Sequence, residues 1–143
     1  MKRPILALMF AIAATGWGYS QVAAKALPVF EIHKPTIVAF FPHMTDAEME
    51  SNPDTNEVLG DFQLYAGAAS KPLREAGIDF QFADTRSFTI RSGGKARTFH
   101  TGKIGIGYYF IAPGKRPRVE YGVMVDADIV DVASKYFGIA IKR

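Results

Sequence analysis

An uninterrupted apolar run over residues 37–41, between Pro35 and Pro42, sets the first condition on the fold. A strand that alternates apolar and polar residues can face water on one side, but a continuous apolar strand needs cover on both faces. The sequence therefore predicts a central strand that is buried from both sides. A polar loop begins at Pro42, and a helix is expected after it.

The segments after this loop have the spacing of two successive helices. Residues 45–48 read Thr-x-x-Glu, the spacing of a capping box in which two side chains cover free backbone N–H groups. Asp54 and Glu57 repeat this spacing and are expected to open a longer helix, which Gly77 ends. Its apolar residues recur every three or four positions and predict one buried stripe: Val58, Phe62, Tyr65, Ala69, Leu73 and Ala76.

A strand and a first hairpin are expected next. Residues 78–82 alternate between apolar and polar side chains, which is the period of a strand. Residues 88–91 and 95–99 flank Ser92-Gly93-Gly94, a sequence typical of a tight hairpin turn.

A second hairpin and a closing helix complete the chain. The hairpin pairs residues 107–112 with residues 118–125, and Pro113-Gly114 suits the two central positions of a type II turn. Asp126 is expected to cap the closing helix, and Gly138 to end it.

The N-terminal segment has the features of a secretory signal peptide. Two basic residues precede an apolar run over residues 5–14, and small residues follow up to Ala24. The run is shorter than the ~20 apolar residues that span a bilayer, which argues against a membrane span. We expect residues 1–24 to be the signal peptide, with cleavage after Ala24 or Ala26, and residues 25–143 to form one periplasmic or secreted domain.

The cysteine count and the charge narrow the range of functions. The chain has no Cys, which excludes thiol–disulfide chemistry, Fe–S clusters and thiolate zinc sites. Cleavage removes two of the 17 basic residues and leaves 15 against 14 acidic ones, so the net charge does not indicate a nucleic-acid partner. No pattern of catalytic residues is found, so no enzymatic activity is predicted.

The order of the expected elements over residues 35–137 resembles that of the thioredoxin-like fold superfamily. Pro72 resembles the proline in the family's long helix, and Gly105-Ile106-Gly107 resembles the Gly-Ile-Pro segment that leads into its hairpin. The resemblance implies an α/β fold with a thioredoxin-like central mixed sheet and flanking helices, to which this sequence adds an extra β-hairpin. The family's Cys-x-x-Cys pair is absent, so redox activity is not implied, and Gly107 occupies the position of the family's cis-proline.

The resemblance also implies a binding site, where the loop after the first strand meets the loop before the hairpin. The expected binding residues are Phe41, Pro42, His43, Met44, Gly105, Ile106 and Gly107. We expect a non-redox protein-binding or assembly module without a cofactor, whose partner is another exported protein. A glycine at position 107 would leave room for the backbone of that partner.

The same loop allows an alternative function as a periplasmic copper-binding carrier. His43 and Met44, with Met49 nearby, offer the imidazole and thioether groups that suit Cu(I), and His33 or His100 could complete a site. In the simpler interpretation, the histidine lies in a surface loop and the methionines pack against the helix. The histidines have no metal-binding spacing, so no metal ligand is assigned.

Charges are segregated along the chain. Residues 46–61 include six acidic and no basic residues, whereas residues 86–118 include eight basic and no acidic ones. Two solvated surfaces would explain this pattern. Alternatively, the basic hairpins, with Phe88, Phe99, Tyr108 and Tyr109 between the charges, bind an anionic ligand. Export argues against a nucleic acid as that ligand.

Overall fold

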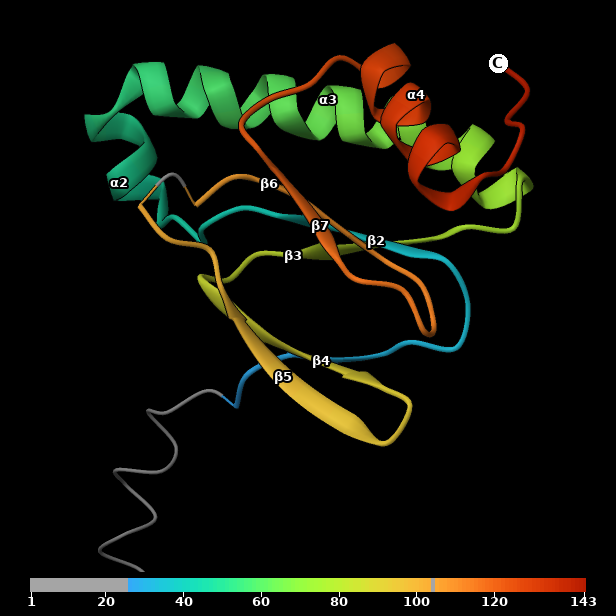
Figure 1. Ribbon diagram of the computed structural model, residues 1–143. Helices are drawn as coiled ribbons and strands as arrows, with labels where there is room; N and C mark the ends of the chain where they lie inside the picture. Colours follow the sequence, from blue (N-terminus) through green and yellow to red (C-terminus); the bar gives the residue numbers. More distant parts are fainter. Residues whose placement is uncertain (1–25, 104) are drawn as a thin grey trace, which may run out of the picture.

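The computed structural model describes residues 26–103 and 105–143, which form a mixed α/β fold with two mixed sheets (Figure 1). The four-stranded sheet has the order β3-β2-β6-β7, with β2 (Thr36–Phe40), β3 (Asp79–Ala83), β6 (Gly107–Ile111) and β7 (Arg118–Tyr121). The three-stranded sheet has the order β1-β4-β5, with β1 (Val29–Glu31), β4 (Ser87–Ser92) and β5 (Lys95–His100). The described helices are α2 (Asp46–Ser51), α3 (Pro53–Glu75) and α4 (Asp126–Phe137).

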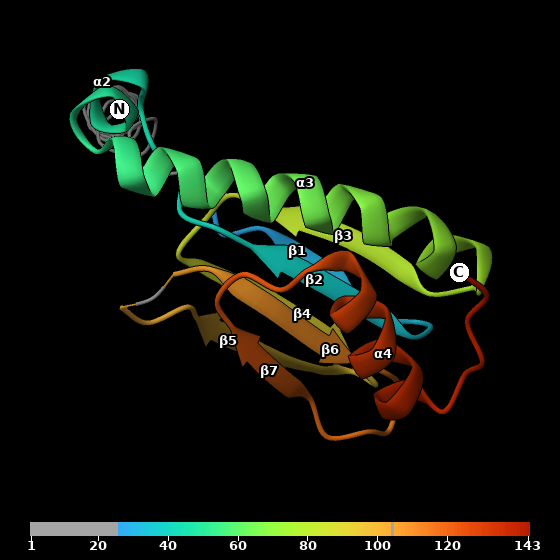
Figure 2. The same cartoon turned by 90° about the horizontal axis from the view of Figure 1, so that it is seen from above.

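The four-stranded sheet is the middle layer of the molecule. Helices α3 and α4 cover one of its faces, and the three-stranded sheet lies on the other side (Figures 1 and 2). Along β2, Ile37 and Ala39 join the core on the helix side, while Val38 and Phe40 join the core between the sheets. All four side chains are fully buried, so the prediction of a central strand covered on both faces is confirmed.

The strand directions fit the predicted central mixed sheet. Strand β2 is parallel to β3 and antiparallel to β6, and β6 is antiparallel to β7. The extra hairpin, β4–β5, pairs with β1 and forms the separate three-stranded sheet. Helices α3 and α4 lie on one face of the central sheet, and this three-stranded sheet lies on the other.

Helix α2 begins with the predicted capping box. The Glu48 backbone N–H donates to Thr45 Oγ1 at 3.3 Å, and the Thr45 N–H donates to Glu48 Oε2 at 2.8 Å. The Thr45 hydroxyl also donates to Glu48 Oε2, at 3.1 Å. The hydrogen bonds that the backbone N–H and the hydroxyl of Thr45 donate to the carboxylate hold the pKa of Glu48 below its usual value.

Helix α3 differs from the prediction at its start and in its buried face. It begins at Pro53 with Asn52 as the N-cap, so Asp54 lies in the first turn and does not cap. Its buried residues are Leu59, Phe62, Ala66, Ala69 and Leu73. Val58, expected in the stripe, is 41% exposed. Phe62, Ala69 and Leu73 of the predicted stripe are buried as expected, and Ala66 is buried where Tyr65 was predicted.

The turns of both hairpins have the expected geometry. Gly93 and Gly94 have φ of +58° and +75°, values that L side chains rarely adopt. In the second hairpin Gly114 has φ +73°, and the Lys115 N–H donates to Ala112 O at 3.1 Å, as in a type II turn. Strand β7 is shorter than predicted and ends at Tyr121.

Helix α4 begins with Val125 as its N-cap and without a side-chain cap, so the prediction that Asp126 caps it is wrong. Gly138, with φ +66°, ends the helix as expected.

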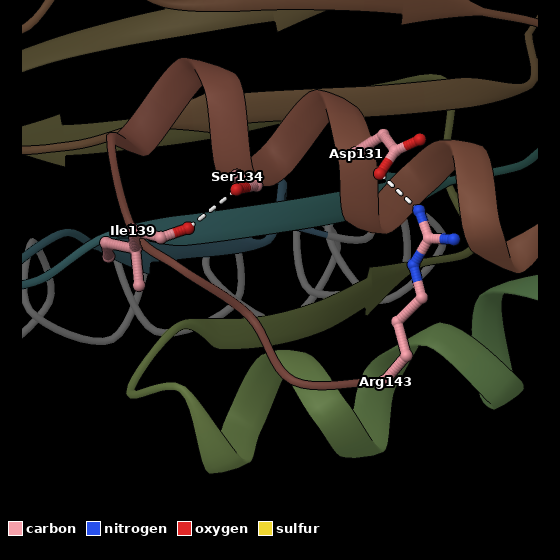
Figure 3. A network of polar contacts seen from close by, with 4 residues as sticks. All are labelled: Asp131, Ser134, Ile139 and Arg143. Atoms are coloured by element: carbon pink, nitrogen blue, oxygen red, sulfur yellow. Dashed lines mark hydrogen bonds and ion pairs between the residues drawn. The ribbon is translucent and has the colours of Figure 1, made fainter.

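The C-terminal tail after α4 folds back along the helix, as Figure 3 shows. Ser134 Oγ donates a hydrogen bond to Ile139 O at 2.7 Å, and Arg143 forms an ion pair with Asp131. Ile139 also packs against the core on the helix side, so the tail is part of the packed domain.

The predicted signal peptide, residues 1–24, lies outside the described residues. Within residues 26–103 and 105–143, no helix combines the length and the apolar character that crossing a membrane requires.

Candidate functional site

The two loops of the expected binding site are adjacent. Strand β2 ends at Phe40, which pairs with Gly107 at the start of β6, so the loops that follow and precede these residues leave the same edge of the sheet. A Cβ atom on Gly105 would lie 3.6 Å from Pro42 Cδ, which is ordinary van der Waals contact.

The seven expected site residues differ in their exposure to solvent. His43 is exposed; Phe41, Pro42 and Met44 are half-buried; Gly105, Ile106 and Gly107 are buried. The Phe41 ring packs 5.9 Å from the Phe62 ring, between centroids, and Ile106 belongs to the core on the helix side. Much of the expected contact surface therefore contributes to the core.

Gly107 has a packing role that the sequence did not reveal. A Cβ atom at this position would lie 2.3 Å from Glu120 O and 2.8 Å from Phe40 Cζ. The space beside Gly107 is therefore filled by the backbone of β7 and by an aromatic ring. The prediction that Gly107 leaves room for a partner's backbone is wrong.

His43 faces Asp84, at the end of the neighbouring strand β3. Its Nδ1 lies 3.5 Å from Asp84 Oδ2, and the two side chains are 64% and 66% exposed. Such an exposed pair stabilises the fold by about 1 kcal/mol at most. The pair borders a cavity of about 350 Å³ that the chain segments at Pro28 and Arg86 also line.

The structure places two of the expected copper ligands, His33 and His43, at opposite ends of a strand. His33 precedes β2 and His43 follows it, so the strand separates them by roughly 17 Å at ~3.4 Å per residue. His100 Nδ1 lies 2.8 Å from Ser87 Oγ, and Met44 packs against the core on the helix side. In the described parts of the chain, no three His, Asp or Glu side chains are placed to hold a metal ion.

Ile106, one of the expected site residues, also lines an apolar cleft of about 340 Å³. Asp54, Thr55 and Val58 from the start of α3 and Val123 from the loop after β7 also line it. Val58 is 41% exposed and Val123 is 39% exposed. Sequence reasoning missed both valines as surface residues, because it placed Val58 in the buried stripe and Val123 in a strand.

A basic cleft of about 490 Å³ lies between β5 and the turn that joins β6 to β7. Lys95 and Arg97 line it from the first hairpin, and Lys115 and Arg116 line it from the second. The sequence identified both hairpins as basic, and the structure shows that their charges face one cavity.

The aromatic residues between these charges do not form an exposed platform. Phe88 and Tyr108 are fully buried, and Tyr109 is 2% exposed. Phe99 is half-buried, with its ring centroid 4.9 Å from that of Tyr109. All four pack in or against the two cores, so they do not present the open row of rings on which nucleic-acid bases stack.

No protein-family model, curated protein or solved structure matches this chain. The functional argument therefore depends on the fold and on the geometry of the clefts.

Proposed function

We propose that the chain is an exported, non-redox thioredoxin-like protein that acts as a protein-binding or assembly module. The strand order β3-β2-β6-β7, with β2 parallel to β3 and antiparallel to β6, supports the thioredoxin-like assignment. The features of residues 1–24 support export, and the absence of Cys supports a function without redox chemistry.

The apolar cleft at Ile106 is the observation that carries this proposal. A single exposed valine is normal on a protein surface, but Val58 and Val123 both line one concave surface together with Ile106. The volume of about 340 Å³ accommodates a large apolar side chain. An apolar anchor residue from an extended partner segment fits this site.

The charge around the cleft indicates the chemistry of the partner. Asp54 lines the cleft. It belongs to the segment 46–61, which contains six acidic residues and no basic residue. None of the residues of α2 is buried, so its acidic groups face solvent. The partner segment should therefore carry basic residues beside its apolar anchor, because complementary charge speeds association and fixes orientation.

Two matched variants test this proposal. Val58 and Leu64 are exposed apolar residues of α3, 41% and 66% exposed, but only Val58 lines the cleft. A photo-crosslinking residue at position 123 should capture an exported partner, and one at position 64 should not. Val58→Asp should then weaken binding of the purified partner about tenfold or more, and Leu64→Asp by less than about twofold. Equal effects of the two substitutions, or no capture from position 123, would refute the proposal.

A further inference from the structure

The basic cleft between the two hairpins contains cationic groups and no carboxylate among its described lining residues. Its charges come from β5 and from the β6–β7 turn, which belong to different sheets. Four like charges around one cavity repel each other, and they create a positive potential that concentrates anions. If these residues only kept the surface solvated, they would not need to line the same cavity.

The ion pairs of the described residues leave three of these charges without a partner. Next to the cleft, Arg91 pairs with Glu31 at 2.5 Å and Arg118 pairs with Glu120 at 2.6 Å. Lys95, Arg97 and Arg116 form no ion pair with any residue in 26–103 or 105–143.

The fourth base, Lys115, is engaged with helix α4. Its Nζ donates a hydrogen bond to Tyr136 O and lies 4.3 Å from the centroid of the Tyr136 ring. The Tyr136 hydroxyl in turn donates to Arg116 O at 2.7 Å. These contacts fix the β6–β7 turn, so this wall of the cleft is formed before any ligand binds.

Tyr109 adds a neutral hydrogen-bond donor to the cleft. Tyr109 lines the cavity and is only 2% exposed. Burial raises the pKa of its hydroxyl, and the positive charge of Arg97 partly opposes the shift. The hydroxyl is therefore protonated at neutral pH, and Tyr109 lines the same cavity as Arg97.

We propose that this cleft binds a small organic phosphate through Lys95, Arg97, Arg116 and the hydroxyl of Tyr109. The cationic groups only donate hydrogen bonds, so the ligand must offer acceptors, and phosphoryl oxygens match the planar fork of arginine. The volume of about 490 Å³ is in the range of small-molecule sites.

This site is separate from the apolar cleft of the proposed function. Ile106 precedes β6, whereas the basic cleft includes Ile111 and the turn after it, at the other end of the strand. The strand spans roughly 17 Å between them. The anion site therefore does not depend on the protein-binding proposal.

Calorimetric titration of the purified protein with inorganic pyrophosphate and with glycerol phosphate tests the proposal. Saturable binding of one ligand per chain is expected. Arg97→Gln should weaken it about tenfold or more, while Lys71→Gln, which makes the same charge change on helix α3, should change it by less than about twofold. Tyr109→Phe keeps the charge and should weaken binding about threefold, which separates a built site from general attraction.

Two further arms identify the source of the phosphoryl group and the class of ligand. If the soluble phosphates bind, the ligand is a free phosphate compound. If the protein binds only to vesicles that contain phosphatidylglycerol, and the variants show the same pattern, the ligand is a lipid headgroup. Circular dichroism should show that every variant is folded. The proposal is overturned if neither phosphates nor vesicles bind, if Arg97→Gln and Lys71→Gln have equal effects, or if citrate binds as tightly as pyrophosphate.

Discussion

Among single residues, Tyr108 carries a hydroxyl that the core does not satisfy. Its side chain is fully buried, with its ring centroid 5.1 Å from that of Phe62, and its hydroxyl has no hydrogen-bond partner among the described residues. Burial raises the pKa of this group, since the charged form cannot be solvated there. An unsatisfied buried hydroxyl costs roughly 1–3 kcal/mol. We therefore expect Tyr108→Phe to raise the free energy of unfolding by about 1 kcal/mol in urea denaturation.

Tyr136 provides the control for this prediction. Its hydroxyl donates to Arg116 O at 2.7 Å, so Tyr136→Phe removes a hydrogen bond that is present and should lower the free energy of unfolding by about 1 kcal/mol. If Tyr108→Phe destabilises the protein as much as Tyr136→Phe does, the Tyr108 hydroxyl has a partner in solution and the prediction is wrong.

At the scale of elements, the approach of β6 to β7 depends on Gly107. A Cβ atom there would lie 2.3 Å from Glu120 O, and a backbone atom of a paired strand cannot move away without disrupting the sheet. Gly107→Ala should therefore lower the free energy of unfolding by about 2 kcal/mol or more, measured by urea denaturation. The matched control is Gly60→Ala in helix α3, where nothing lies within 4 Å of the added carbon. This change should stabilise the protein by roughly 0.5–1 kcal/mol, and equal losses at the two positions would contradict the packing argument.

The elements that were predictable are those specified by a few neighbouring residues. The capping box at Thr45 and Glu48 and the turn at Gly93-Gly94 depend on chemistry within four positions, so their sequence signals were sufficient. In α3, Phe62, Ala69 and Leu73 are buried as predicted. At the start of the helix, however, Leu59 is buried and Val58 is exposed, because the contact with the sheet decides which of two neighbouring positions is covered. Strand β7 ends early because the next residue, Gly122, has φ +97°, which is outside the range of an extended strand.

At the scale of the whole molecule, the pairing of β2 with β6 makes the two expected loops adjacent, as the resemblance stated from the sequence implied. The exposure of the loop residues was not predictable, because Ile106 and Phe41 are covered by side chains of α3 and the central sheet. The basic cleft was foreseen only as two charged segments. Its cavity exists because the hairpins belong to different sheets that pack face to face, and neither hairpin contains that information alone.

The two cores share the central sheet, which leads to a prediction about unfolding. Neighbouring residues of β2 and β6 enter opposite cores: Val38 and Tyr109 pack between the sheets, while Ala39 and Tyr108 pack under the helices. Loss of either core exposes one face of the same strands, so we expect a single cooperative transition.

Fluorescent probes in each core can test this cooperativity. A chain of residues 25–143 lacks Trp17, the only tryptophan, and so has no background signal. Phe99→Trp reports on the core between the sheets and Phe137→Trp on the core under the helices, and both positions are partly buried. The two variants, each measured by tryptophan fluorescence and by circular dichroism in urea, should show coincident transitions by both methods. An earlier transition of the Phe99→Trp fluorescence than of the circular dichroism would mean that the three-stranded sheet detaches first, and that the basic cleft is lost before the rest of the fold.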